Sequence, residues 1–184
     1  GILDAAQPGA TAIEQVTRFL GALESFAGER RRAAPVHPYY TECADPVPVS
    51  VTRIFTAPWG TDEPVNIPDE CKVELYWQAM PGERREETDR QFFDWLKGVL
   101  PDAPQVEFPI RWLPGSAIAP GEPVITELAA AAEAATGTRP VLAGIEGPCD
   151  MYVFHQFGIP AVLWGPRGGN THCADEYVEI ESVV

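Results

Sequence analysis

The chain has 184 residues, of which 45% are hydrophobic and 22% are charged, as in a folded globular protein rather than a disordered one. Its formal net charge of -14 at pH 7 repels phosphate backbones, so we expect no nucleic-acid partner. No apolar run is long enough to span a membrane, and no leader of the signal-peptide type opens the sequence. The four cysteines are widely separated, which favours reduced thiols in a cytoplasmic protein.

Helical and strand-like patterns alternate in the first part of the sequence. Thr11 and Glu14 form a capping-box pattern, and apolar residues at helical spacing then predict a helix over 11–26. Residues 28–47 are rich in Arg, Ala and Pro and are typical of a loop. The remaining patterns predict a strand over 49–55, a strand over 71–77 with Val73, Leu75 and Trp77 on one face, a helix over 85–100 and a strand over 106–113.

This order of elements indicates an α+β domain over residues 1–117. A sheet covered by two helices on one face is an open-faced sandwich. The ferredoxin-like βαββαβ pattern has one strand more, ahead of the first helix, and we expect it to precede Gly1. The sequence therefore looks like part of a longer chain.

A Pro- and Gly-rich stretch over 114–123 marks the expected domain boundary, and residues 118–184 form the second part. Its patterns predict a helix over 124–135, a strand over 141–144, a helix over 150–157 and a strand over 161–164. Alternating helices and strands indicate part of an α/β domain with a parallel sheet. Two short strands are too few for such a sheet, so this part needs further chain.

The most informative tract runs from 158 to 178. An apolar strand pattern leads into a glycine-rich loop, and the loop is followed by His172 and then by Asp175 and Glu176. Sites in α/β sheets lie at the carboxyl ends of strands, and a neutral imidazole is a good zinc ligand. The spacing alone leaves two interpretations open, a metal ligand or an ordinary histidine in a surface loop.

Several motifs occur in the order found in one enzyme family. They are Gly-x-x-Ala-Ile at 9–13, Pro-Gly-Glu at 81–83, Gly-x-x-Asp at 147–150 and the closing tract 158–178. The chain thereby resembles the zinc metallohydrolases that include acetylornithine deacetylases, succinyl-diaminopimelate desuccinylases, aminoacylases and carboxypeptidase G. The tract 76–83 is most similar to the acetylornithine deacetylase branch.

The resemblance implies a lid and dimerisation domain followed by the closing segment of a catalytic domain. In the family, two zinc ions, for which Co²⁺ can substitute, activate a water that attacks the amide of an N-acyl amino acid or small peptide, with a Glu as general base. Carried over to this chain, His172 is a zinc ligand. Four residues border the substrate, namely Asn66, Asp150, Gly168 and Asn170. The resemblance also implies a homodimer formed through the lid domain.

The departures from the family pattern are equally informative. The other family ligands, a His-x-Asp pair, a bridging Asp and a Glu-Glu pair, lie upstream of the lid domain and are not in this sequence. Glu86 and Glu87 follow the Pro-Gly-Glu turn and so do not match that pair. In the family, a histidine of the lid domain reaches across the dimer to the scissile carbonyl; it should fall near Ile2, where the sequence has no histidine. Gln78 stands where many relatives have an Arg. We therefore expect the chain itself to be inactive.

Other readings remain for comparison. A non-catalytic module that dimerises or binds a ligand through the lid sheet explains the first domain without any enzyme. A thiol hydrolase would use Cys149 or Cys173, but a buried or incidental cysteine is the favoured interpretation of both. Asp150 also fits a plain helix N-cap, and His37 and His155 fit structural or exposed positions.

Overall fold

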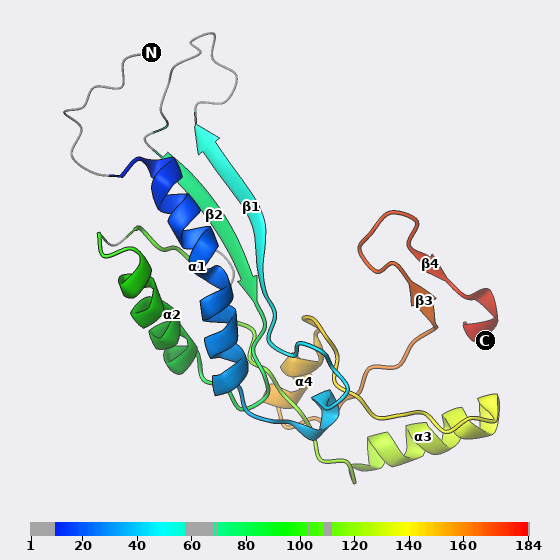
Figure 1. Cartoon of the computed structure of the whole chain (residues 1–184). Helices are drawn as coiled ribbons and strands as arrows, with labels where there is room; N and C mark the ends of the chain where they lie inside the picture. The colour runs from blue at the N-terminus through cyan, green and yellow to red at the C-terminus, as the bar shows by residue number, and fades with distance from the viewer. Residues whose placement is uncertain (1–9, 58–67, 69, 103, 109–111, 184) are drawn as a thin grey trace. The chain divides into compact units, whose positions relative to one another are not determined.

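The computed structural model describes residues 10–57, 68, 70–102, 104–108 and 112–183 (Figure 1). The described chain is a mixture of helices and two small antiparallel sheets, as an α+β protein has. It divides into two compact units. Unit 1 comprises Gly1–Ser116 with Leu142–Pro148, and unit 2 comprises Ala117–Val141 with Cys149–Val184. In the described part of the chain, no helix combines the length and apolar character needed to cross a membrane.

Helix α1 (Ala12–Ala33) opens unit 1 and begins with the predicted capping box. The backbone N–H of Glu14 donates to the Thr11 hydroxyl at 3.2 Å, and the backbone N–H of Thr11 donates to the Glu14 carboxylate at 2.8 Å. The prediction that the helix ends at 26 was wrong. Its last two turns are held by tertiary contacts of Arg30 and Arg31, which the local composition does not reveal. The 3₁₀-helix η1 (Pro38–Tyr40) follows.

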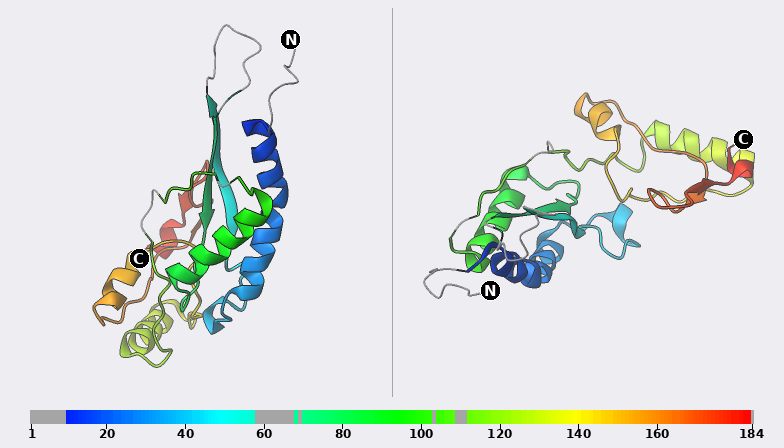
Figure 2. Two further views of the ribbon diagram at one scale, coloured as in Figure 1. Left: turned by 90° about the vertical axis from the view of Figure 1, so that its left-hand side faces the viewer. Right: turned by 90° about the horizontal axis from the view of Figure 1, so that it is seen from above.

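The predicted strands over 49–55 and 71–77 are confirmed as β1 (Val49–Ala57) and β2 (Glu70–Trp77). They pair antiparallel from Val49 opposite Trp77 to Ala57 opposite Glu70, with a bulge between Val51 and Arg53. Helices α1 and α2 (Arg85–Val99) lie on one face of this sheet (Figures 1 and 2). The helix predicted over 85–100 is thereby confirmed.

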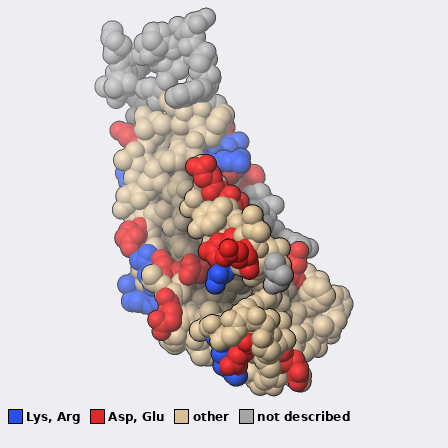
Figure 3. Space-filling view, turned by 90° about the vertical axis from the view of Figure 1, so that its right-hand side faces the viewer, with Lys and Arg blue, Asp and Glu red and all other residues tan. Residues whose placement is uncertain are grey.

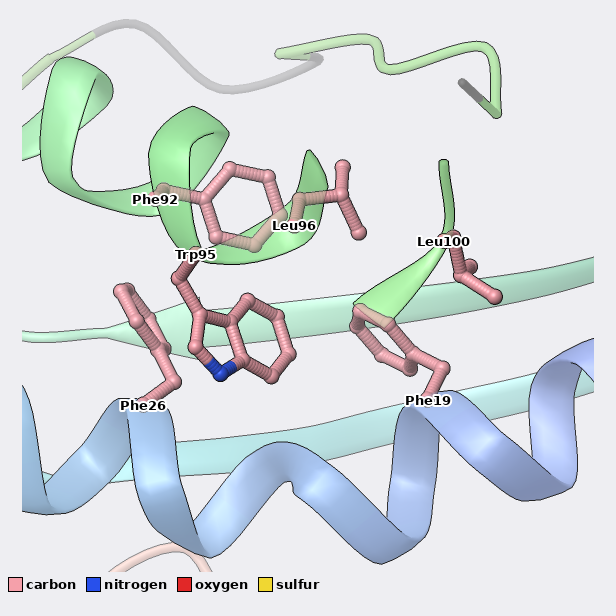
Figure 4. Packing of buried hydrophobic residues seen from close by; sticks show 6 residues of the cluster. All are labelled: Phe19, Phe26, Phe92, Trp95, Leu96 and Leu100. Carbon is pink, nitrogen blue, oxygen red and sulfur yellow. The ribbon is translucent and has the colours of Figure 1, made fainter. Parts of the chain in front are cut away.

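The core of unit 1 lies between the two helices and the sheet. Phe19 and Phe26 of α1 meet Phe92, Trp95 and Leu96 of α2 there, as Figure 4 shows. The predicted inward face of β2, Val73, Leu75 and Trp77, packs against this cluster. The Trp95 indole N–H donates to the Ser25 hydroxyl at 2.8 Å, so the one polar atom of that ring is satisfied.

The prediction of a strand over 106–113 was wrong for the residues of this range that the structure describes. Residues 104–108 and 112–113 are irregular, and 109–111 lie outside the described residues. In the described part of unit 1, β2 has β1 as its one strand neighbour. An extended segment becomes a strand only when a neighbour supplies its ladder hydrogen bonds, and residues 104–108 have no such neighbour in the described part of the chain.

In the second part of the chain, after residue 117, the two predicted helices are confirmed but the two predicted strands are not. Helices α3 (Pro123–Thr136) and α4 (Met151–Gln156) confirm the predictions over 124–135 and 150–157, and Gly137 closes α3 in the left-handed conformation. Residues 141–144 and 161–164 are irregular, and the described residues include no parallel sheet for them to join. The strands of unit 2 are instead β3 (Gly168–Gly169) and β4 (Tyr177–Val178), followed by the 3₁₀-helix η2 (Ile180–Ser182).

Candidate functional site

The candidate site is a short β-hairpin in unit 2 that carries His172 in its loop. Its two strands pair antiparallel, with Gly168 opposite Val178 and Gly169 opposite Tyr177. A Cβ atom on Gly168 would lie 2.2 Å from the carbonyl oxygen of Tyr177, so a side chain does not fit there. The glycines of the predicted loop therefore allow the two strands to approach, and no substrate contact is needed to explain Gly168.

Hydrogen bonds close the open end of this hairpin. The Arg167 N–H donates to the Ser182 hydroxyl at 2.8 Å, and the Glu179 N–H donates to the Arg167 carbonyl at 2.8 Å. The Arg167 guanidinium also pairs with the Glu179 carboxylate at 2.9 Å. These contacts join η2 to the start of β3, so the two ends of the loop are held together.

The loop from 170 to 176 has an unusual backbone. Asn170, His172 and Asp175 have φ angles of 56°, 61° and 59°, in the left-handed region that most residues avoid. The Asn170 side-chain amide donates to the Asp175 carbonyl at 3.3 Å, and the Cys173 N–H donates to the Asn170 carbonyl at 2.8 Å. His172 is exposed, and its ring makes no hydrogen bond or ion pair with the residues that the structure describes.

The donors around His172 do not make a zinc site by themselves. Zinc takes three or four protein ligands, and the described residues contain no group of three His, Cys, Asp or Glu side chains placed to share a metal ion. The donor set near the loop thus amounts to one imidazole with carboxylates nearby in sequence. A zinc ion at His172 would need two or three further ligands besides this imidazole.

The other predicted substrate-binding residues are dispersed. Asp150 is exposed at the N-cap position of α4, but its side chain makes no capping hydrogen bond. Asn170 lies in the hairpin loop, and its amide is used within that loop. Asn66 lies outside the described residues.

The remaining histidines have local structural roles. A ring nitrogen of His155 lies 3.0 Å from the Ala161 carbonyl oxygen, which joins α4 to the segment after it. The His37 ring accepts the Tyr39 N–H at 3.3 Å and thereby caps η1. Both agree with the structural interpretation made from the sequence.

The four cysteines are free thiols. A hydrogen bond to the Glu146 carboxylate, together with partial burial, raises the pKa of the Cys43 thiol above its ordinary value. Burial likewise raises the pKa of the Cys71 thiol. Both shifts disfavour the nucleophilic thiolate, so neither thiol is activated for catalysis. Cys149 is half-buried, and Cys173 is exposed beside His172 in the loop.

The sequence analysis missed a buried ion pair in unit 1. Arg30 is fully buried, and its guanidinium is paired with the Glu83 carboxylate of the Pro-Gly-Glu turn. The same guanidinium donates to the Gln78 carbonyl at 2.8 Å, while Glu83 accepts the Met80 N–H at 2.7 Å. The one sequence feature that could have indicated this pair is Glu83 directly after the Pro81-Gly82 turn, because the turn directs the Glu83 carboxylate toward Met80 and Arg30. Arg30 itself lay in a segment that composition assigned to a loop.

The surface charge is mixed. On the face shown in Figure 3, basic side chains lie beside acidic ones, in agreement with exposed pairs such as Arg53 with Glu74 and Lys72 with Glu70. Exposed pairs of this kind contribute little to stability.

Comparison with known proteins adds no further assignment, because the chain matches neither a family model nor a curated protein.

Proposed function

We propose that this chain is the lid domain and the closing catalytic segment of a zinc-dependent amidohydrolase that cleaves N-acyl amino acids or small peptides. The observation that carries the proposal is the exposed His172 at the end of a closed glycine hairpin. An imidazole with no other partner among the described residues is available to bind a metal ion. The motifs at 9–13, 81–83, 147–150 and 158–178 support the same family.

Unit 1 agrees with the lid part of this proposal. Two helices on one face of an antiparallel pair of strands are the central elements of a ferredoxin-like sandwich. On this proposal a further strand, from chain that precedes α1, adds to the free edge of β2. Residues 106–113 would then gain a neighbour to pair with.

The proposed activity is tested on the gene product in its full encoded length. We expect the purified protein to contain zinc and to release the amino acid from N-acyl amino acids. His172→Asn removes the imidazole but keeps a residue that tolerates the left-handed backbone, so it should lose both bound zinc and turnover. Zinc content by mass spectrometry and product release by amino-acid analysis are the two measurements.

His37→Asn is the matched control, because Asn can replace His37 as a cap of η1. His37 lies in unit 1, whereas His172 lies in unit 2. It should keep zinc and activity. The proposal fails if His172→Asn retains full zinc content and turnover, or if the wild-type protein shows neither.

A second proposed function, dimerisation through the lid sheet, is favoured by the exposure of β1. In the described residues β1 is an edge strand, and Val51, Ile54 and Phe55 expose 37%, 52% and 59% of their surface. Val51 lies opposite Leu75 and Ile54 lies opposite Val73, so these side chains share one face of the sheet. On that face, Leu75 and Val73 of β2 pack against the core. An edge strand of nine residues that exposes several apolar side chains favours pairing with another chain.

Dimerisation is tested by placing a lysine at this edge. Ile54→Lys should weaken the dimer by about tenfold or more, because a buried edge excludes charge. Thr126→Lys, on the exposed surface of α3, adds the same charge as a control. Sedimentation equilibrium of the two variants and the wild type gives the dissociation constants. A monomeric wild type, or equal constants for both variants, would contradict the proposal.

A further inference from the structure

The family resemblance places Asn170 beside the substrate, and the structure shows its side chain hydrogen-bonded within the hairpin loop. Its side-chain amide donates to the Asp175 carbonyl at 3.3 Å across the loop. Its own carbonyl accepts the Cys173 N–H at 2.8 Å. Both hydrogen bonds therefore span His172, from Asn170 before it to Cys173 and Asp175 after it.

The loop backbone requires this support. Asn170, His172 and Asp175 all have positive φ angles, a conformation that is unfavourable for residues with a Cβ atom. Asn is the side chain that best tolerates it, since its short amide bonds to nearby backbone. His172 has no such compensation, because its ring makes no hydrogen bond with described residues. Its backbone conformation therefore depends on the hydrogen bonds that Asn170 makes with Cys173 and Asp175.

We propose that Asn170 is a positioning residue that fixes the direction in which the loop presents His172. The identity of the ligand that His172 binds rests on the proposed function. The way in which His172 is held rests on the loop geometry. Asn170 acts through His172, and the zinc site does not need Asn170 as a contact of its own.

The hydrogen bonds at the open end of the hairpin are separate from those of the loop. Arg167, Glu179 and Ser182 join η2 to β3, and in the described structure their side chains form no hydrogen bond or ion pair with residues 170–176. Asp175 contributes its backbone carbonyl to Asn170, so its carboxylate is dispensable for this bond. These differences provide control variants within one hairpin.

The inference is tested by NMR on the whole chain without added metal. In the wild type, the positive φ of His172 gives a strong nuclear Overhauser effect between its amide proton and its own Hα, and the Cys173 amide exchanges slowly. Asn170→Ala and Asn170→Asp both remove the donor to Asp175. We expect each to lose the Overhauser signature at His172 and to speed exchange of the Cys173 amide by about tenfold, as loss of one hydrogen bond predicts.

Two controls keep the loop bonds. Arg167→Ala removes the exposed ion pair, and Asp175→Asn keeps the carbonyl and a residue suited to positive φ. Both should retain the wild-type signature at His172. If Asn170→Ala also retains it, with unchanged exchange at Cys173, Asn170 does not position His172 and the inference is overturned.

A separate titration distinguishes this result from failure of the proposed function. Zn²⁺ added to the full-length protein should perturb the ring resonances of His172. If Zn²⁺ leaves the ring unperturbed while Asn170→Ala still disorders the loop, the zinc assignment fails and the positioning role of Asn170 is supported.

Discussion

Arg30 is fully buried near the end of α1, where its charge is matched by the Glu83 carboxylate. A charge removed from water is costly unless a partner and hydrogen bonds compensate it. Glu83 supplies the partner and also binds the Met80 N–H, so it joins α1 to the turn after β2. The Arg30 Nε atom is the one buried side-chain polar atom without a partner in the described residues. The pair therefore constrains how the helix and the turn meet.

Removing Glu83 should strongly destabilise unit 1. Glu83→Ala leaves the Arg30 charge buried and unpaired, which is expected to cost about 3–5 kcal/mol in the free energy of unfolding. Glu70→Ala removes the exposed partner of Lys72 and should have little effect. Urea unfolding followed by circular dichroism measures both. Equal midpoints for the two variants would show that the buried pair is not needed.

The thiols should differ in reactivity in a way that depends on pH. The raised pKa of Cys43 keeps it protonated at neutral pH, so iodoacetamide should modify the exposed Cys173 first. Cys43 should become reactive as the pH rises above the ordinary range for a thiol. Glu146→Gln removes the negative charge that raises this pKa and should shift the reactivity of Cys43 to lower pH. Peptide mapping by mass spectrometry gives the rates, and faster labelling of Cys43 than of Cys173 at neutral pH would contradict this account.

Elements differ in how far local sequence determines them. The start of α1 and the helices α2, α3 and α4 were predicted because apolar spacing, the Thr11 capping box and the Gly137 stop act within a few residues. The predictions of β1 and β2 were confirmed because each strand finds the other as a neighbour. The strands at 141–144 and 161–164 were wrong, because a strand needs a partner that local sequence does not supply.

The segment 142–148 illustrates what replaces a missing partner. The Gly144 N–H donates to the Tyr39 carbonyl at 2.6 Å, and the Tyr40 hydroxyl donates to the Ile145 carbonyl at 3.0 Å. A Cβ atom on Gly144 would lie 2.3 Å from the Tyr40 ring. The segment thus belongs to unit 1 through contacts with η1 that no sequence pattern indicated.

Gly144→Ala should destabilise unit 1 by about 1–3 kcal/mol, because the new methyl group overlaps the Tyr40 ring. Gly21→Ala is the opposite control. Gly21 is exposed within α1 with no atom near its Cβ position, so alanine there should stabilise the helix by about 1 kcal/mol. Thermal unfolding of both variants measures the sign directly. A stabilising Gly144→Ala would contradict the close packing of Tyr40.

On the scale of the whole molecule, the core of unit 1 is formed, whereas the proposed zinc site has one candidate ligand, His172, among the described residues. The sequence correctly placed His172 in a glycine loop, but the roles of its neighbours depend on hydrogen bonds that sequence does not show. Gly168 is explained by strand approach and Asn170 by its bond to Asp175. The described residues include no group of three His, Cys, Asp or Glu side chains placed to share a metal ion, and sequence patterns alone place no further ligand beside His172.

On the proposed function, whose other family ligands lie upstream of the lid domain, we expect the chain of 184 residues to have no hydrolase activity of its own. One imidazole cannot hold the zinc ions that amide hydrolysis of this type requires. Product release from N-acyl amino acids should stay at the rate of buffer when Zn²⁺ or Co²⁺ is added. A metal-dependent turnover by this chain would show that its own residues complete a site.

The most direct test of the account is a crystal structure of the full-length gene product with diffraction data at the zinc absorption edge. We predict an anomalous peak about 2.0–2.1 Å from a ring nitrogen of His172, with the remaining ligands contributed by chain outside the residues described. A His172 ring that points into solvent or against apolar side chains, with every zinc peak elsewhere, would contradict the assignment of this protein as a zinc hydrolase.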